Sequence, residues 1–150
     1  MAALDYVGKA NRYIRDVTSG KRSACLFVRQ ACERQLRDLE RSEKNAKDFP
    51  FLFDRKAANR PCAFTEHLRH VKGPKAGEQI HLEDWQCFII TTLYGWKYRS
   101  GKWEGRRRFR KSYTEVPRGN GKSTLCSALA LYMLCADGES GADIYSFATT

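Results

Sequence analysis

The sequence predicts an α/β fold in which a helical N-terminal region precedes the start of a parallel sheet, in strand–loop–helix–strand order. Three observations lead to this prediction. Apolar residues recur at spacings of three and four through the first 45 residues, as in amphipathic helices. A glycine-rich turn at residues 119–121 lies between a strand-like segment and an apolar helical one. A second strand-like run follows at residues 142–148.

Composition limits the class of protein and its partners. A chain of 150 residues, 42% of them hydrophobic, has room for one sizeable core or for part of a larger one. Lys and Arg number 27 against 17 Asp and Glu, and the net charge of +10 favours an anionic partner such as nucleic acid, a nucleotide or acidic lipid. No apolar stretch approaches the roughly 20 residues that span a bilayer, which excludes a transmembrane segment. Six cysteines without a C-x-x-C spacing or a signal peptide are expected to be reduced thiols of a cytoplasmic protein.

Two amphipathic patterns predict the helices of the N-terminal region. The first begins at Leu4 and ends near Gly20, because glycine readily takes the left-handed conformation that stops many helices. The second runs to about Lys44. Its expected packed face comprises Ala24, Val28, Ala31, Cys32, Gln35, Leu36 and Leu39.

The middle of the chain is less regular. Residues 49–77 hold three of the four prolines and show no sustained period, so they are predicted to be connecting structure with one short helix at 65–70. A helix is predicted over 82–93, with Glu83 and Asp84 in its first turn and Gly95 as its end.

The C-terminal part provides the α/β elements. Residues 109–116 have strand-like content, and residues 123–136 are apolar nearly all round, which predicts a helix covered on several sides. Residues 142–148 are predicted to form the second strand.

The stretch Val116–Thr124 has the character of a phosphate-binding P-loop. Gly119 and Gly121 lack side chains, so main-chain N–H groups can close around phosphate oxygens, and the following helix N-terminus adds donors and positive charge. Lys122 would reach the β- and γ-phosphates, and the Ser123 hydroxyl would ligate Mg²⁺. The predicted binding set is Gly119, Asn120, Gly121, Lys122, Ser123 and Thr124. An ordinary glycine turn with a solvated lysine is the alternative, since the first glycine of G-x-x-x-x-G-K-[ST] is replaced by Val116.

These residues resemble a known family. The phrase Glu115–Leu125 is similar to the atypical Walker A loop of the large subunit of tailed-phage terminases, the ATP-driven motors that pump DNA into preformed capsids. In that loop a basic residue sits early and the usual first glycine is missing. Further segments resemble the family in the same order: Asp16–Lys21, Ala31–Leu39, Leu82–Gln86, Tyr94–Trp96 and Asp137–Ser146.

The resemblance covers the whole chain but only the front part of a family member. It implies a helical region over residues 1–80 and the first part of a P-loop ATPase domain over 81–150, without the Walker B carboxylates and the nuclease domain. It also implies ATP and Mg²⁺ as cofactors, with hydrolysis in the complete motor and no activity of this chain alone. The implied partners are double-stranded DNA, the terminase small subunit, the capsid portal and further copies in a ring, all in the host cell cytoplasm.

Two site residues take their roles from the resemblance. Arg118 resembles the basic residue that senses or stabilises the γ-phosphate, a role that suits the planar guanidinium. Gln86, following Trp85, resembles the adenine-recognition glutamine, whose amide can donate to and accept from the adenine edge. A surface glutamine in a helix is the alternative for Gln86.

A basic segment and two histidines complete the candidates. Between Lys97 and Arg118, nine Lys and Arg against two Glu give +7, with aromatic residues interleaved, which suits contact with DNA phosphates. A solvated hairpin at the sheet edge is the alternative. His67 and His70 are three residues apart, but no third ligand is spaced to join them in a metal site.

Two other functions stay open at this point. The chain could belong to another P-loop NTPase, such as a helicase or a nucleotide kinase, although the missing first glycine and the early Arg118 count against this. It could also be a truncated basic fragment that binds nucleic acid but no nucleotide, or that does not fold alone.

Overall fold

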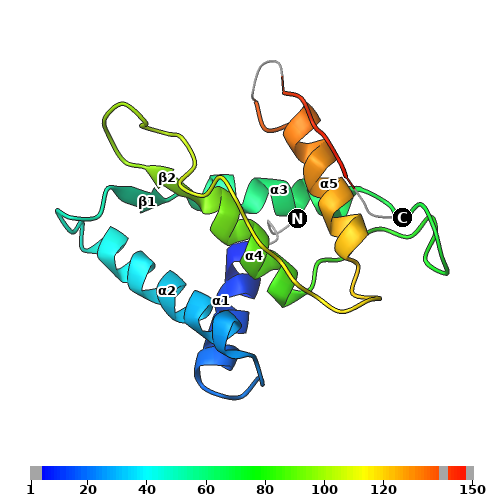
Figure 1. Cartoon of the computed structure of the whole chain (residues 1–150), viewed down its shortest axis with the longest axis horizontal. Helices are drawn as coiled ribbons and strands as arrows, with labels where there is room; N and C mark the ends of the chain where they lie inside the picture. Colours follow the sequence, from blue (N-terminus) through cyan, green and yellow to red (C-terminus); the bar gives the residue numbers. More distant parts are fainter. Residues whose placement is uncertain (1–4, 139–141, 148–150) are drawn as a thin grey trace. The chain divides into compact units, whose positions relative to one another are not determined.

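The computed structural model describes residues 5–138 and 142–147, which form five helices and two short strands (Figure 1). In chain order these are α1 (Tyr6–Thr18), α2 (Leu26–Glu43), β1 (Phe51–Phe53), α3 (Arg55–His67), α4 (Asp84–Gly95), β2 (Trp96–Tyr98) and α5 (Lys122–Cys135). None of the helices in these residues combines the length and the apolar character that crossing a membrane requires. The chain divides into two compact units: residues up to Ala63 with Leu82–Ser112, and Phe64–His81 with the residues from Tyr113 onwards.

The first unit is built on α1 packed against α4. The apolar spacing predicted for this helix is confirmed at Val7, Ala10, Ile14 and Val17, which are buried together with Tyr6 and Tyr13. Leu4, the predicted start, lies outside the described residues. The Tyr13 and Phe88 rings lie 5.6 Å apart, and Arg12 donates to both carboxylate oxygens of Asp84 at 2.7 and 3.1 Å. Helix α1 ends at Thr18, with Gly20 at a φ of +79°, where the sequence predicts the stop.

Helix α4 ends at Gly95 as predicted, and packing explains why a glycine is needed there. A Cβ on Gly95 would overlap the Phe53 ring and come within 3.0 Å of the Ala58 Cβ. The missing side chain lets α4 pass directly into β2, which pairs antiparallel with β1 in the register Phe53 opposite Trp96.

Trp96 is the centre of the first unit's core. Its side chain is fully buried, and its ring meets those of Phe49 and Phe53 edge-on at 5.7 and 5.1 Å. The indole N–H donates to Gln35 Oε1 at 2.8 Å, so the one polar atom of the ring is satisfied inside the core. Trp96 therefore connects the small sheet to α2.

Helix α2 packs through a polar face that the sequence analysis described incompletely. Its buried residues are Cys32, Gln35 and Asp38, three residues apart, and Asp38 accepts a 2.6 Å hydrogen bond from Arg108. Leu36, which was expected on the packed face, is 43% exposed. The buried face of α2 therefore differs from the predicted apolar face. It is turned toward the Trp96 N–H and the Arg108 guanidinium, two donors that need polar acceptors when they are buried.

The prediction of connecting structure over 49–77 with a short helix at 65–70 is wrong for residues 55–67, which form α3. Asp54 starts this helix, since its Oδ1 accepts from the Ala57 N–H at 3.0 Å. Pro61 lies within α3, where it removes one main-chain donor. Burial outweighs this cost, because one face of the helix is wholly buried: Ala58, Pro61, Cys62 and Thr65.

The six cysteines are free. Cys32, Cys62 and Cys87 are fully buried and pack as small apolar side chains. Burial raises the pKa of the Cys32 thiol to about 11, so the thiol is protonated at neutral pH.

The second unit contains α5 and the end of α3. One face of α5 is buried through Leu125, Ala128 and Tyr132, and the Tyr132 ring lies 5.4 Å from that of Phe64. Leu131 and Leu134 are 40% and 54% exposed, so the all-round cover expected for this helix is not present in the described residues.

The two strands predicted in the C-terminal part are absent from the described residues. Residues 109–116 and 142–147 form no strand, and residue 148 lies outside the described range. The β1–β2 pair is antiparallel, so no parallel sheet is present in the described residues. A strand forms only beside a partner, and two strands joined by a crossover helix need not be neighbours in an α/β sheet. The described structure is mixed helical with a small sheet.

Two carboxylates make the first unit sensitive to acid. Hydrogen bonds from Arg12 lower the pKa of Asp84 from its ordinary 3.8, against the opposite effect of burial. Burial raises the pKa of Asp54, but the hydrogen bonds from Lys97 and two main-chain amides outweigh it, so the net pKa is lowered. Each carboxylate thus contributes stability that is complete above its unfolded pKa and is lost as the pH falls through its folded pKa.

We therefore expect the melting temperature to change little near neutrality and to fall below about pH 4. The double substitution Asp54→Asn with Asp84→Asn should lower the melting temperature at pH 7 and reduce its fall on acidification. Asp143→Asn, an exposed carboxylate of the second unit, serves as the control and should change neither quantity. A fall of the same size in the double variant would contradict the assignment.

Candidate functional site

The candidate phosphate loop directly precedes α5 and is shaped by two glycines. Gly119 and Gly121 have φ values of +83° and +68°, in the left-handed region that other residues rarely adopt. Nothing lies within 4 Å of the place where a Cβ of Gly119 would be. A side chain would therefore fit at this position, and it is the positive φ that favours glycine. The Asn120 side-chain amide donates to the carbonyl oxygens of Pro117 and Arg118 at 3.2 and 3.4 Å and closes the turn.

The main-chain amides at the start of α5 are available to a ligand. The first hydrogen bond of the helix runs from the Leu125 N–H to the Gly121 oxygen at 2.9 Å. The amides of Lys122, Ser123 and Thr124 precede it and therefore have no acceptor within the helix. These donors and the positive end of the helix dipole favour an anion at this position.

The side chains of the loop are open to solvent. Arg118, Asn120, Lys122 and Ser123 are exposed, and Thr124 is half-buried. Lys122 forms no ion pair with a carboxylate among the residues that the structure describes. The structure thus brings the predicted loop residues together as one exposed, cationic turn at a helix N-terminus.

Gln86 has a structural partner that the sequence analysis did not identify. It lies in the first turn of α4, and its Oε1 accepts from the Glu83 N–H at 2.9 Å in a capping box. Glu83 is thus the residue that caps α4. The S/T-x-x-E/Q-like spacing of Glu83 and Gln86 is the signal that could have revealed this bond. Gln86 belongs to the first unit and the loop to the second, and its adenine role stays a prediction.

No group of three or more His, Cys, Asp or Glu side chains in the described ranges could hold a metal ion. His67 is exposed at the end of α3, and His70 is half-buried in the segment that follows. The Ser123 hydroxyl is exposed, and its role as a Mg²⁺ ligand stays a prediction.

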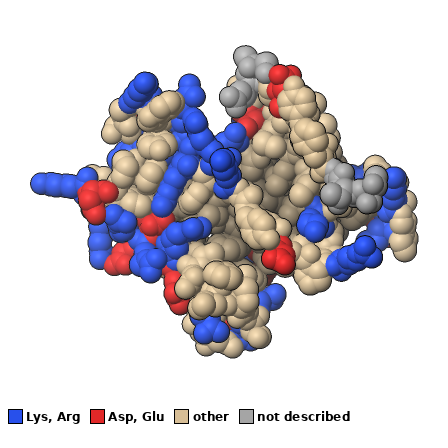
Figure 2. Space-filling view, in the orientation of Figure 1, with Lys and Arg blue, Asp and Glu red and all other residues tan. Residues whose placement is uncertain are grey.

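The basic segment forms a loop that turns back on β2. We call residues 99–110 the basic loop; it holds six Lys and Arg against one Glu. Main-chain bonds from Tyr98 N–H to the Arg106 oxygen (3.0 Å) and from Arg108 N–H to the Trp96 oxygen (2.9 Å) fold it as a hairpin. A hairpin, the alternative given for this segment, is therefore present, and it lies beside β2 and not at the edge of a parallel sheet. Figure 2 shows lysine and arginine atoms gathered on this unit.

Comparison with known proteins finds a family match for residues 84–150. Residues 84–150 match the family model described as terminase large subunit, ATPase domain. The resemblance is confirmed over these residues, which include the loop, and a terminase-related ATPase function is supported. The similar segments Asp16–Lys21 and Ala31–Leu39 lie outside the match, so the resemblance there stays a prediction. Searches of curated proteins and of solved structures find no match.

Proposed function

We propose that this chain, whose residues 84–150 belong to the terminase large subunit ATPase domain family, binds Mg²⁺-ATP through the loop at residues 118–124. The observation that carries the proposal is the conformation of this loop. Two left-handed glycines turn the chain into α5 so that three amides without helical acceptors and the exposed Lys122 lie together. The family match includes this loop.

The chemistry of the loop residues suits a triphosphate. The amides and Lys122 would bind phosphate oxygens, and the Arg118 guanidinium would pair with the γ-phosphate. A single hydroxyl from Ser123 fits Mg²⁺, which usually keeps several waters and takes its other ligands from the phosphates. Bound there, the metal would neutralise charge on the phosphates during transfer to water. None of these protein groups is a general base, so their proposed work is binding and orientation.

The adenine contact of Gln86 is a separate proposal, which rests on the family match that includes this residue. Its Oε1 already accepts the Glu83 N–H, so the carboxamide group is held in one orientation by the capping box. The amide nitrogen would then donate to an adenine ring nitrogen.

We further propose the cellular setting that the family implies. The chain would supply the nucleotide-binding part of a phage packaging motor that acts on double-stranded DNA with a small subunit and a capsid portal, as a ring of copies. The family match favours this over a helicase or a nucleotide kinase. DNA-stimulated turnover of a full-length version would separate it from a kinase, whose turnover responds to a small-molecule acceptor.

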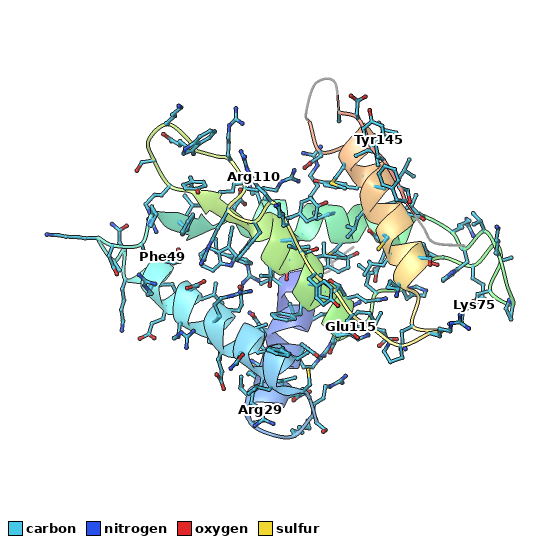
Figure 3. The ribbon with its side chains drawn as sticks, in the orientation of Figure 1. Arg29, Phe49, Lys75, Arg110, Glu115 and Tyr145 are labelled. Atoms are coloured by element: carbon cyan, nitrogen blue, oxygen red, sulfur yellow. The ribbon has the colours of Figure 1, made fainter. Side chains whose placement is uncertain are left out.

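Nucleotide binding is tested by thermal stability. Saturating Mg²⁺-ATP at 100 times its dissociation constant should stabilise the chain by about 2.7 kcal/mol, seen as a rise in melting temperature of several degrees. Lys122→Ala should abolish the rise, since it removes the ammonium group of the loop. Lys75→Ala is the matched control and should leave the rise intact, because this exposed lysine, labelled in Figure 3, belongs to the same unit as the loop. An equal rise in all three proteins would overturn the proposed site.

A further inference from the structure

We propose that the basic loop binds the phosphate backbone of duplex DNA through Lys102, Arg106 and Arg110, gathered around the Trp103 ring. The inference rests on the proposed function, which takes double-stranded DNA as a partner, and it adds the residues that hold the DNA. It differs from the sequence prediction, which treated the whole basic segment as one candidate surface.

The structure divides the seven Lys and Arg residues from Lys97 to Arg110 into two groups. The first group is used inside the first unit. Lys97 pairs with Asp54 at 2.9 Å and Arg108 with Asp38 at 2.6 Å. Arg99 donates to the Ser42 oxygen at 3.0 Å, and the Arg107 guanidinium lies 5.0 Å from the Tyr94 ring. These cations hold the hairpin on α2, β1 and α4.

The second group comprises Lys102, Arg106 and Arg110, which are exposed. None of the three forms an ion pair with a carboxylate of the described chain, and Glu104, the acidic residue of the loop, also takes part in none there. Their charges are thus free to meet an external anion. Arg110 is labelled in Figure 3, where it lies on the chain that leaves the loop.

The three cations are gathered by one aromatic side chain. Lys102 Nζ lies 5.4 Å from the centroid of the Trp103 ring, and the Cζ atoms of Arg106 and Arg110 lie 5.3 and 5.5 Å from it. The tryptophan is 42% exposed, which is unusual for a residue that buries well. Its ring attracts cations to its face and holds otherwise flexible side chains in one region.

The backbone beneath this cluster is fixed. The Glu104 N–H donates to the Gly101 oxygen and the Arg106 N–H to the Trp103 oxygen, at 3.0 and 2.9 Å. Gly101 and Gly105 take positive φ values of +83° and +74° at these turns. A fixed loop presents its charges with less entropy to lose on binding than a disordered tail.

Closely spaced cations without acidic partners match the repeating charge of a duplex backbone. Backbone contacts of this kind carry no base sequence information, which suits a protein that must hold any DNA. Single-stranded DNA would instead use the tryptophan as a stacking platform for bases, and the cations that crowd the ring argue against that use.

Salt dependence of duplex binding tests the proposal, measured without nucleotide. The triple variant K102Q/R106Q/R110Q should reduce the slope of log K against log salt by about 2 to 3, since each phosphate contact contributes about 0.9. The control R29Q/K56Q/K75Q removes the same charge from exposed cations elsewhere and should leave the slope unchanged. Equal slopes in the two triple variants would overturn the proposal.

A second variant tests the contribution of the Trp103 ring separately from that of the three cations. Trp103→Ala keeps the charge and should weaken duplex binding about threefold at an unchanged slope. A loss confined to single-stranded DNA would show base stacking and overturn the duplex assignment. A loss in the triple variant of binding to phosphatidylserine vesicles, with duplex binding intact, would assign the loop to lipid instead.

The melting shift with Mg²⁺-ATP, measured on the same triple variant, keeps this test apart from that of the nucleotide site. An unchanged shift with a reduced slope supports both proposals. An unchanged slope with an unchanged shift would overturn the DNA contact alone.

Discussion

Replacing Trp96 with alanine is expected to lower the free energy of unfolding of the first unit by about 3–5 kcal/mol. The change removes the largest fully buried side chain and the ring that Phe49 and Phe53 meet edge-on. It also leaves the Gln35 Oε1, in a side chain that is 4% exposed, without its donor. Since a domain is stable by only about 5–15 kcal/mol, most of the cooperative transition should be lost.

Chemical denaturation followed by circular dichroism measures the effect, with Trp103→Ala as the matched control. Trp103 is exposed, so its removal should change the stability by less than about 1 kcal/mol. Trp96→Phe separates the two contributions, because it keeps an aromatic ring while removing the donor to Gln35. Equal stabilities of Trp96→Ala and Trp103→Ala would contradict the packing described for β2.

The substitution Arg108→Ala is expected to cost about 3 kcal/mol, although arginine substitutions at a surface usually cost little. The reason is the Asp38 carboxylate, whose side chain is 7% exposed and would be left as an unpaired charge. The guanidinium also lies 4.4 Å from the Phe51 ring centroid and 4.8 Å from that of Phe109, so aromatic packing is lost with the ion pair.

Arg106→Ala, two residues away, is the control for this prediction. It should change stability by less than about 0.5 kcal/mol, because Arg106 is exposed and contacts the exposed Trp103. The double variant D38N/R108A tests the cause, since it removes the unpaired charge and should recover part of the loss. An Arg108→Ala protein as stable as Arg106→Ala would show that the pair contributes nothing.

Helices with a strong apolar period were predictable from the sequence. The pattern from Leu4 to Gly20 reports both the buried face and the end of α1, because spacing and a left-handed glycine are local signals. The helix at 122–135 was likewise found within a residue of its bounds. The turn at Gly119 and Gly121 is predictable because glycine favours positive φ values, and both residues have them. The phosphate-binding role of this turn stays a prediction.

What could not be predicted depends on contacts distant in the sequence. The paired strands β1 and β2 are three residues each, too short for a period, and they are separated by 42 intervening residues. In the sequence Asp38 resembles a solvated surface charge, because its partner Arg108 is 70 residues further along the chain. Pro61 is unfavourable within a helix, which led to the prediction of connecting structure at 55–67. Burial of one face of α3 outweighs this local preference.

Gly121, the N-cap residue of α5, determines which acceptors the first amides of this helix can find. Many helices begin with a serine, threonine or aspartate whose oxygen accepts an early amide, but Gly121 has no side chain to do so. The first amides of α5 therefore have no side-chain acceptor at the N-cap. A phosphate oxygen bound there would accept hydrogen bonds from these amides. Phosphate binding and the rigidity of the α5 N-terminus would therefore increase together.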